Sequence, residues 1–147
     1  MLDPNDQRIL NELRVDARVP VQQLARKVKM PRSTVQHRIN RMREEGTIQR
    51  IVAIPSYDKI GLPVTAFILL TYMPTSGVSQ QDLARSIARL PNVAEVHVVA
   101  GQWDLIVKAR GASLRQIGEL VVNQLRQVPG VGQTVTCGCF FTLKEEP

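Results

Sequence analysis

The sequence contains no run of 18 or more apolar residues, so no segment is long and apolar enough to span a membrane as a helix. Its first ten residues, MLDPNDQRIL, lack the basic segment followed by an apolar one that marks a secretory signal. These two absences predict a cytoplasmic protein that has no membrane partner.

Cysteine is scarce, since the 147 residues include only Cys137 and Cys139. Two cysteines separated by a single residue rarely form a disulfide bridge, and they imply no disulfide framework. Together with the two histidines they match no zinc-binding pattern, so we predict neither a metal site nor a cofactor. Ordinary packing on a strand is the favoured interpretation of the pair, with redox or metal chemistry as the alternative.

Acidic residues are absent from residues 26–43, although this segment is strongly basic. Residues 1–50 hold 11 basic and 6 acidic residues, a net charge of +5, whereas residues 51–147 hold 8 and 7, a net of +1. So concentrated a positive field indicates a polyanionic partner such as DNA, with a merely solvated helix face as the alternative. The basic residues of the segment are Arg26, Lys27, Lys29, Arg32, Arg38, Arg41 and Arg43.

The spacing of apolar residues predicts three short helices near the N-terminus. Asp3 is suited to cap the first helix and Pro4 to occupy its first position. The second helix is expected at residues 21–28, and the third begins near Arg32 and ends before Gly46, a residue typical of a left-handed cap. Three short helices, the last two joined by a tight turn, form a helix-turn-helix.

In a helix-turn-helix the second helix of the pair enters the major groove of DNA. Val35, Ile39 and Met42 are spaced to pack inward, which leaves a polar side for DNA. Arginine suits guanine, glutamine suits adenine, and serine or threonine suits bases or phosphates. Arg38 has two alternatives that the sequence favours equally: a contact with a DNA phosphate, or an ion pair with an acidic side chain of the same domain. The predicted DNA-binding residues are Arg32, Ser33, Thr34, Gln36, His37, Arg38 and Arg41.

The remaining sequence predicts a second domain of different character. Residues 47–56 have the pattern of a short strand, and beyond them strand and helix patterns follow the order βαββαβ of a ferredoxin-like unit. The strands are expected at residues 64–73, 93–100, 103–110 and 132–143, and the helices at 78–90 and 113–128. The predicted α+β chain comprises a DNA-binding domain at residues 1–50, a strand linker at 51–62 and the ferredoxin-like domain at 63–147.

Two helices cover only one face of such a sheet. The strand segments FILL and VHVV are apolar on both sides, so the second face also needs cover. A second subunit that packs sheet to sheet would supply it. We therefore expect a dimer at minimum, an arrangement that also suits a two-fold operator on DNA.

Four stretches of the sequence, taken in order, resemble the Lrp/AsnC (feast/famine) family of transcriptional regulators: LDPNDQRILNEL, VQQLARKVKMPRSTVQHRINRMREEGTIQRIVA, VAEVHVVAGQWDLIVKA and PGVGQTVT. The resemblance covers nearly the whole chain. It implies a winged-type helix-turn-helix joined by a strand linker to an effector-binding and oligomerisation domain. It also implies dimers that often assemble into octamers, and a small molecule, commonly an amino acid, that binds between dimers and alters assembly or DNA contacts.

The resemblance also implies an effector site. By position, the family's Gly-x-aromatic-Asp loop corresponds to Gly101, Gln102, Trp103 and Asp104. Backbone amides of such a loop can hold a carboxylate while Asp104 meets an ammonium group; the alternative is a plain hairpin in which Asp104 accepts turn amides. Thr134 and Thr136 lie where the family's last strand faces the effector, with ordinary strand packing as their alternative.

Two prolines depart from the family pattern. Pro20 and Pro31 stand where the family usually has a serine at the start of the second and third helices. Proline fits a first helical turn but removes a capping hydroxyl worth ~1 kcal/mol. The two helices are still expected to form, although at the third helix a phosphate contact is also lost.

The sequence therefore predicts a sequence-specific DNA-binding regulator that responds to an amino acid or related small molecule, and not an enzyme. One alternative is an architectural DNA-binding protein without an effector, which would share every N-terminal feature. The other is an enzyme like the siroheme decarboxylases, which resemble this two-part architecture. Such an enzyme needs cationic and histidine groups that converge in the second domain, where His97 is the one histidine and the basic residues look scattered.

Overall fold

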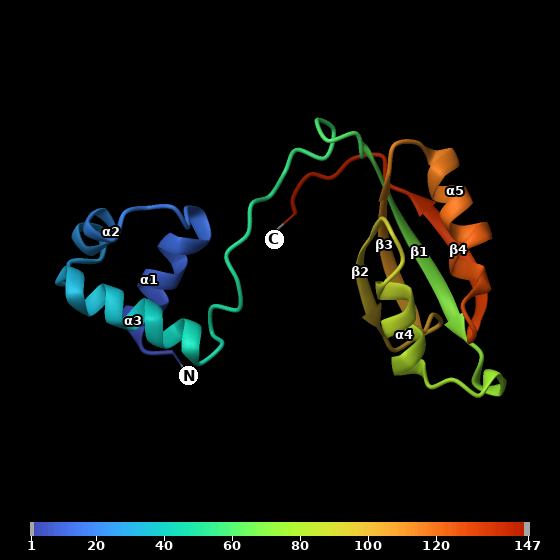
Figure 1. Ribbon diagram of the computed structural model, residues 1–147, viewed down its shortest axis with the longest axis horizontal. Helices are drawn as coiled ribbons and strands as arrows, with labels where there is room; N and C mark the ends of the chain where they lie inside the picture. The colour runs from blue at the N-terminus through green and yellow to red at the C-terminus, as the bar shows by residue number, and fades with distance from the viewer. Residues whose placement is uncertain (1, 146–147) are drawn as a thin grey trace. The chain divides into compact units, whose positions relative to one another are not determined.

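The computed structural model describes residues 2–145, which divide into two compact units between Ala53 and Ile54 (Figure 1). Each unit encloses its own cluster of buried apolar side chains. Within residues 2–145, every helix is too short or too polar to cross a bilayer.

The first unit consists of the three helices predicted, α1 (Pro4–Val15), α2 (Val21–Val28) and α3 (Arg32–Glu44). The Asp3 side chain caps α1 as expected, since it accepts hydrogen bonds from the first-turn amides of Asn5 and Asp6. Lys29 ends α2 in a left-handed conformation, with φ at 56°, and so turns the chain toward α3. Gly46 follows α3 with φ at 75°, which confirms the predicted left-handed cap.

The core of this unit lies between the three helices. Val35 and Met42 are fully buried and Ile39 packs against them, so the predicted inward face of α3 is confirmed. Neither Pro20 nor Pro31 supplies a side-chain cap, yet both helices form, because the carbonyls of these prolines accept the first helical amides at 2.9 and 3.1 Å.

Residues 47–63 include no strand, so the strand predicted at residues 47–56 and the strand character of the linker at 51–62 are wrong for the single chain. The reason is that a strand needs a hydrogen-bonding neighbour. Instead, residues 51–56 run without regular structure and expose Ile51, Val52 and Ile54.

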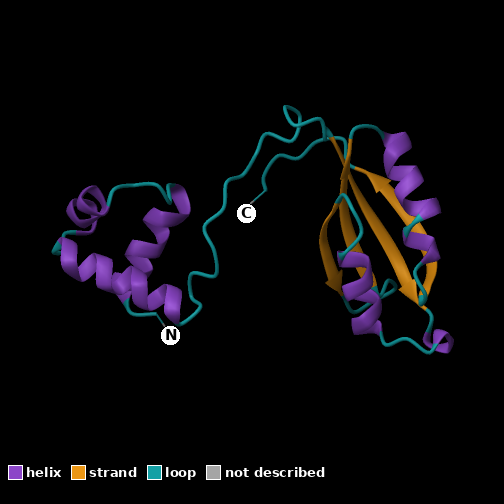
Figure 2. Cartoon of the chain, viewed as in Figure 1, coloured by secondary structure: helices purple, strands orange, loops and turns teal. Residues whose placement is uncertain are grey.

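The second unit is a four-stranded antiparallel sheet with two helices (Figure 2). Its strand order, β2-β3-β1-β4, and its βαββαβ chain order confirm the predicted ferredoxin-like arrangement. The elements are β1 (Val64–Tyr72), α4 (Gln80–Ala88), β2 (Val93–Val98), β3 (Leu105–Gly111), α5 (Leu114–Asn123) and β4 (Val131–Gly138), with short 3-10 turns at Pro74–Ser76 and Leu125–Gln127.

Both helices pack on the same face of the sheet. Ile68 and Leu70 of β1 are buried in one cluster that also contains Leu83 of α4 and Ile117 of α5. The other face, here called the open face, carries no helix among the described residues. Its side chains come from Thr65, Phe67 and Leu69 of β1, Ile106, Lys108 and Arg110 of β3, Glu95 and His97 of β2, and Val135 and Cys137 of β4.

Three details of the predicted elements are wrong. The apolar spacing of the helix predicted at residues 113–128 places Leu114 in the core, but Leu114 is 62% exposed because it is the first residue of α5. That helix ends at Asn123, since Gln124 has nonhelical dihedral angles. The last strand ends at Gly138 and not at residue 143, because its partner β1 begins at Val64 and has no residue to pair with residues 141–143.

Candidate DNA interface and effector site

The N-terminal half of α3 presents a polar surface. Its exposed residues include five of the predicted DNA-binding residues, namely Arg32, Ser33, Thr34, Gln36 and His37. Between them Val35 points into the core, and Gln36 donates a hydrogen bond to Asn40 one turn later at 3.0 Å. The geometry leaves the first turns of the helix free to meet base edges, as entry into a major groove requires.

Arg38 and Arg41, the two other predicted DNA-binding residues, lie in an ion-pair network with the start of α1. Arg38 Nη1 is 2.5 Å from an Asp3 carboxylate oxygen and 2.9 Å from Oδ1 of Asp6. Arg41 pairs with the second Asp6 oxygen. Of the two partners that the sequence left open for Arg38, the structure shows the acidic one.

The network changes the proton affinity of Asp3 and of Arg38. The hydrogen bond from Arg38 lowers the pKa of Asp3 to about 2, and the backbone amide of Asp6 acts in the same direction. The hydrogen bonds to Asp3 and then Asp6 raise the pKa of Arg38. Because both partners stay charged, the network fixes the orientation of α3 against the beginning of α1.

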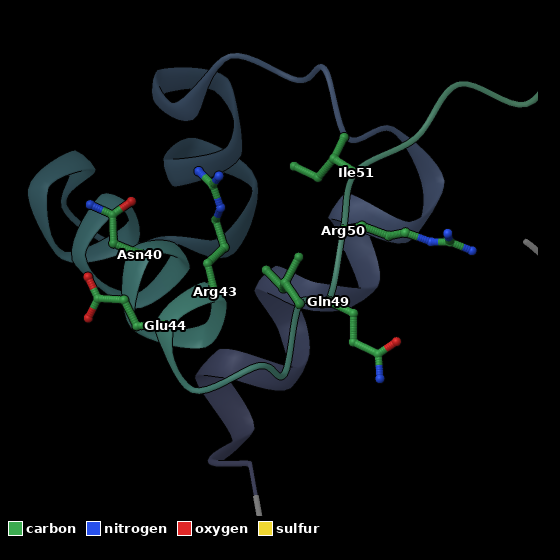
Figure 3. Close-up of a pocket in the computed structure, with 7 residues that line it drawn as sticks. Asn40, Arg43, Glu44, Gln49, Arg50 and Ile51 are labelled. Atoms are coloured by element: carbon green, nitrogen blue, oxygen red, sulfur yellow. The ribbon is translucent and has the colours of Figure 1, made fainter.

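A cleft of about 480 Å³ lies where the chain leaves α3 (Figure 3). Arg43 stands on the last turn of α3, and Arg50 follows on the segment after Gly46; both side chains are exposed. Arg50 lies outside the acid-free segment 26–43, so the charge pattern did not predict it as a DNA-binding residue. The cleft is lined by Asn40, Arg43, Glu44, Ile48, Gln49, Arg50 and Ile51.

The loop from Gly101 to Asp104 joins β2 to β3. Gly101 has φ at 138°, a conformation that favours glycine. The Asp104 carboxylate accepts the backbone amide of Tyr72 at 2.7 Å, and the Asp104 amide donates to the carbonyl of Leu70 at 3.0 Å. Asp104 thus accepts a backbone amide, as its structural alternative predicted, although the amide belongs to β1 and not to the turn. Its contact with an ammonium group stays a prediction.

The two predicted threonines lie on β4. Their register partners, Leu70 for Thr134 and Ile68 for Thr136, place both on the helix-covered face of the sheet. Thr134 accepts a hydrogen bond from Arg126 at 3.0 Å, whereas Thr136 is exposed. Leu70 is the register partner of Thr134, and its carbonyl also accepts the amide of Asp104. The loop and Thr134 therefore lie on either side of the same end of β1.

The basic residues of the second unit are less scattered than the sequence suggested. Lys108 and Arg110 lie together on the open face, close to His97. Each is paired, however: Lys108 with Glu95 at 3.1 Å and Arg110 with Glu145 at 2.8 Å. Hydrogen bonds from His97 and then Lys108 lower the pKa of Glu95. These groups therefore balance one another's charge instead of lining a basic pocket.

The two cysteines are free. Cys137 lies opposite Phe67 on the open face, and Cys139 continues the same ladder by donating its amide to Thr65 at 2.9 Å. Within residues 2–145, no three histidine, cysteine, aspartate or glutamate side chains gather as a metal site would require.

Sequence comparison assigns both units. The model of the Lrp/AsnC ligand-binding domain matches residues 65–147, and a model of the winged helix-turn-helix DNA-binding domain matches residues 2–49. The chain belongs to the Lrp/AsnC family. It is a transcriptional regulator with a helix-turn-helix DNA-binding domain and a ligand-binding domain.

Relatives of this Lrp/AsnC regulator share its full length. An uncharacterized HTH-type transcriptional regulator of Pyrococcus abyssi is 47% identical over 99% of this chain and 97% of its own. A feast or famine regulatory protein of M. tuberculosis, solved in complex with L-methionine, has a TM-score of 0.90 at 25% identity and covers 99% of this chain and 97% of its own. A transcriptional regulator of Neisseria meningitidis has the same fold, with a TM-score of 0.91, 21% identity and coverage of 99% and 94%.

Proposed function

We propose that this regulator reads double-stranded DNA through the N-terminal half of α3 and that an amino acid bound to the second unit modulates its DNA binding. The exposed polar surface that Arg32, Gln36 and their neighbours form on α3 is the observation that carries the proposal. The opposite side of the helix is held by the buried core and by the ion pairs to α1. A rigidly held helix with free polar side chains suits base reading.

The residues of α3 divide into roles. Arg32 and Gln36 contact base edges, and Ser33, Thr34 and His37 contact bases or nearby phosphates. Arg38 and Arg41 are already bound by carboxylates, so they contribute orientation and positive potential, with phosphate contact left to their remaining N–H groups. Arg43 and Arg50, on either side of the cleft after α3, add phosphate contacts.

The proposed effector is an amino acid or related small molecule. The M. tuberculosis relative solved with L-methionine supports this class of ligand. Gly101, Gln102, Trp103 and Asp104 offer backbone amides and a carboxylate, and Thr134 and Thr136 offer hydroxyls on β4, the strand on the other side of β1. The proposed assembly is a dimer at minimum and an octamer in full. Because its target is chromosomal DNA, we place the protein in the cytoplasm.

Fluorescence anisotropy tests the proposal. The full chain is titrated onto labelled DNA from upstream of its own gene at several salt concentrations, first alone and then with each of the twenty amino acids, methionine foremost. Tight, salt-dependent binding that one amino acid shifts is the expected result. Binding that none shifts would favour the architectural alternative. Affinity no higher than for random DNA would overturn the proposal, and a tetrapyrrole decarboxylation assay would then test the enzyme alternative.

A further inference from the structure

Arg126 brings a positive charge to one of the proposed effector residues. It lies on the short 3-10 turn Leu125–Gln127 that leads into β4. Its Nε donates a hydrogen bond to the hydroxyl oxygen of Thr134 at 3.0 Å. The residues that the sequence predicted for the effector site contribute a single charged side chain, that of Asp104. The folded chain therefore adds a cation that the sequence did not place there.

The turn that carries Arg126 is held on both sides. Leu125, directly before it, is fully buried in the core of the second unit. Directly after it, the amides of Gln127 and Val128 donate to backbone carbonyls of the turn, both at 3.1 Å. The side chain of Arg126 is exposed, yet its Nε is fixed by Thr134. The two terminal nitrogens of the guanidinium group are therefore presented to solvent in a defined position.

The charge of Arg126 is not balanced by any carboxylate of residues 2–145. Arg126 donates only to a neutral hydroxyl, so the N–H groups of its Nη1 and Nη2 remain available. This distinguishes it from four other basic side chains of the second unit, each of which forms an ion pair. They are Arg85, Lys108, Arg110 and Arg115.

The hydrogen bond also directs the hydroxyl group of Thr134. Because its oxygen accepts from Arg126, its own hydrogen is left to donate. The free N–H groups of Arg126 and this O–H group therefore form a set of donors. An ionised carboxylate only accepts hydrogen bonds, and a guanidinium group binds it through two parallel N–H···O bonds. A side-chain amide matches the set less well, because its own NH₂ group would face the guanidinium.

We propose that Arg126 and Thr134 select an effector amino acid whose side chain ends in a carboxylate, namely aspartate or glutamate. The inference rests on the proposed function, in which amides of the loop from Gly101 to Asp104 bind the α-carboxylate and Asp104 binds the α-ammonium group. The loop and Thr134 lie on either side of β1. With both α-groups at the loop, the side chain of the ligand is the part that reaches Arg126, and a carboxylate there neutralises the guanidinium group.

Calorimetric titration of the full chain with L-aspartate and L-glutamate tests the inference, with L-asparagine, L-glutamine and L-methionine as neutral ligands for comparison. The wild type is expected to bind one acid at least about tenfold more tightly than the corresponding amide, because hydrogen bonds between charged groups are the stronger ones. Arg126→Gln should lose this preference by losing affinity for the acid alone. Arg126→Lys keeps the charge without the planar fork, so its preference should be intermediate.

Arg89→Gln is the matched control. Arg89 is also an exposed arginine without an ion pair among the described residues, and it follows α4 directly. It precedes β2, whereas the effector loop follows the other end of that strand. The control should leave every affinity unchanged. A purely structural role of Arg126 in holding β4 would instead lower the affinities of Arg126→Gln for acids and amides alike.

Two results would overturn the inference and leave the proposed effector site standing. One is tighter binding of a neutral amino acid than of either acid by the wild type. The other is a preference for the acid that Arg126→Gln does not change, because another group would then carry the selectivity. If the wild type binds no amino acid at all, effector binding itself fails and the inference with it. DNA affinity measured on the same samples would then show whether the rest of the proposed function stands.

Discussion

Arg38 of α3 donates to Asp6 of α1 at 2.9 Å, across 32 residues of sequence. Asp6 is only 2% exposed, and its second oxygen is bound by Arg41. A buried carboxylate that receives two guanidinium groups holds the two helices in one relative orientation. The proposed DNA-reading surface of α3 thus depends on an acidic residue of α1.

Replacing Asp6 by alanine should destabilise the first unit by about 2–4 kcal/mol, because Arg38 and Arg41, both partly buried, each lose one carboxylate partner. Urea unfolding followed by circular dichroism measures the loss. Glu44→Ala is the control, since Glu44 is an exposed carboxylate at the end of α3, and it should change the free energy of unfolding by no more than about 0.5 kcal/mol. If Asp6→Ala and Glu44→Ala lower the free energy of unfolding equally, the ion pairs of Asp6 with Arg38 and Arg41 do not contribute to stability.

Asp3 makes stability depend on pH. Its pKa in the folded protein is about 2, below the value of about 3.9 for an unfolded aspartate. The folded state therefore holds the proton less tightly, so Asp3 adds stability above about pH 5, and this contribution disappears as the pH falls from about 4 toward 2. The difference in free energy of unfolding between wild type and Asp3→Asn should shrink over this interval. A constant difference would contradict the assignment.

Local signals in the sequence predicted the helices of the first unit well. Asp3 and Pro4 mark the start of α1, and Gly46 follows the end of α3, because caps depend on residues within one turn. The partner of Arg38 was not predictable in the same way. Several acidic residues occur in the domain, and only packing of the helices selects Asp3 and Asp6.

Contacts between segments that are distant in the sequence explain the other differences between the predicted and the observed structure. The apolar pattern after Gly46 is typical of a strand. A strand also needs a neighbouring strand to which its backbone can hydrogen-bond, and the described residues of the single chain provide no such partner for this segment. Lys108 and Arg110 look scattered among the basic residues of the sequence, and only the register of β3 shows that they share one face of the sheet. Their carboxylate partner, however, lies 35 residues beyond Arg110, and nothing local connects Glu145 with this strand.

Base-reading and phosphate-binding residues should respond differently to substitution. Arg32→Ala and Gln36→Ala should each cost about 1–3 kcal/mol on the preferred sequence and little on random DNA, since both are proposed to contact base edges. Arg50→Ala should weaken binding to all sequences alike and lower the slope of log affinity against log salt by about 1. Anisotropy titrations on specific and random duplexes separate the two classes. If Arg32→Ala loses the same affinity for specific and random DNA, Arg32 contacts a phosphate and not a base.

Asp104 links the proposed effector loop to the sheet, so its substitution tests two roles at once. Alanine removes the acceptor of the Tyr72 amide and should destabilise the second unit by about 1–2 kcal/mol. Asparagine keeps an oxygen at that position and should restore most of this loss. If Asp104 also binds an ammonium group, both variants should lose at least about tenfold in effector affinity, because a charge-assisted hydrogen bond contributes about 1.5–3 kcal/mol.

Calorimetric titration with the amino acid identified by the DNA-binding assay measures the effector affinity of Asp104→Asn. The same variant should retain the DNA affinity of the wild type in the absence of effector, because the loop and α3 belong to different units. Full effector affinity in Asp104→Asn would limit Asp104 to its bond with Tyr72. The ammonium partner would then have to be sought elsewhere, because no other effector residue proposed in the loop or on β4 has a charged side chain. These residues are Gly101, Gln102, Trp103, Thr134 and Thr136.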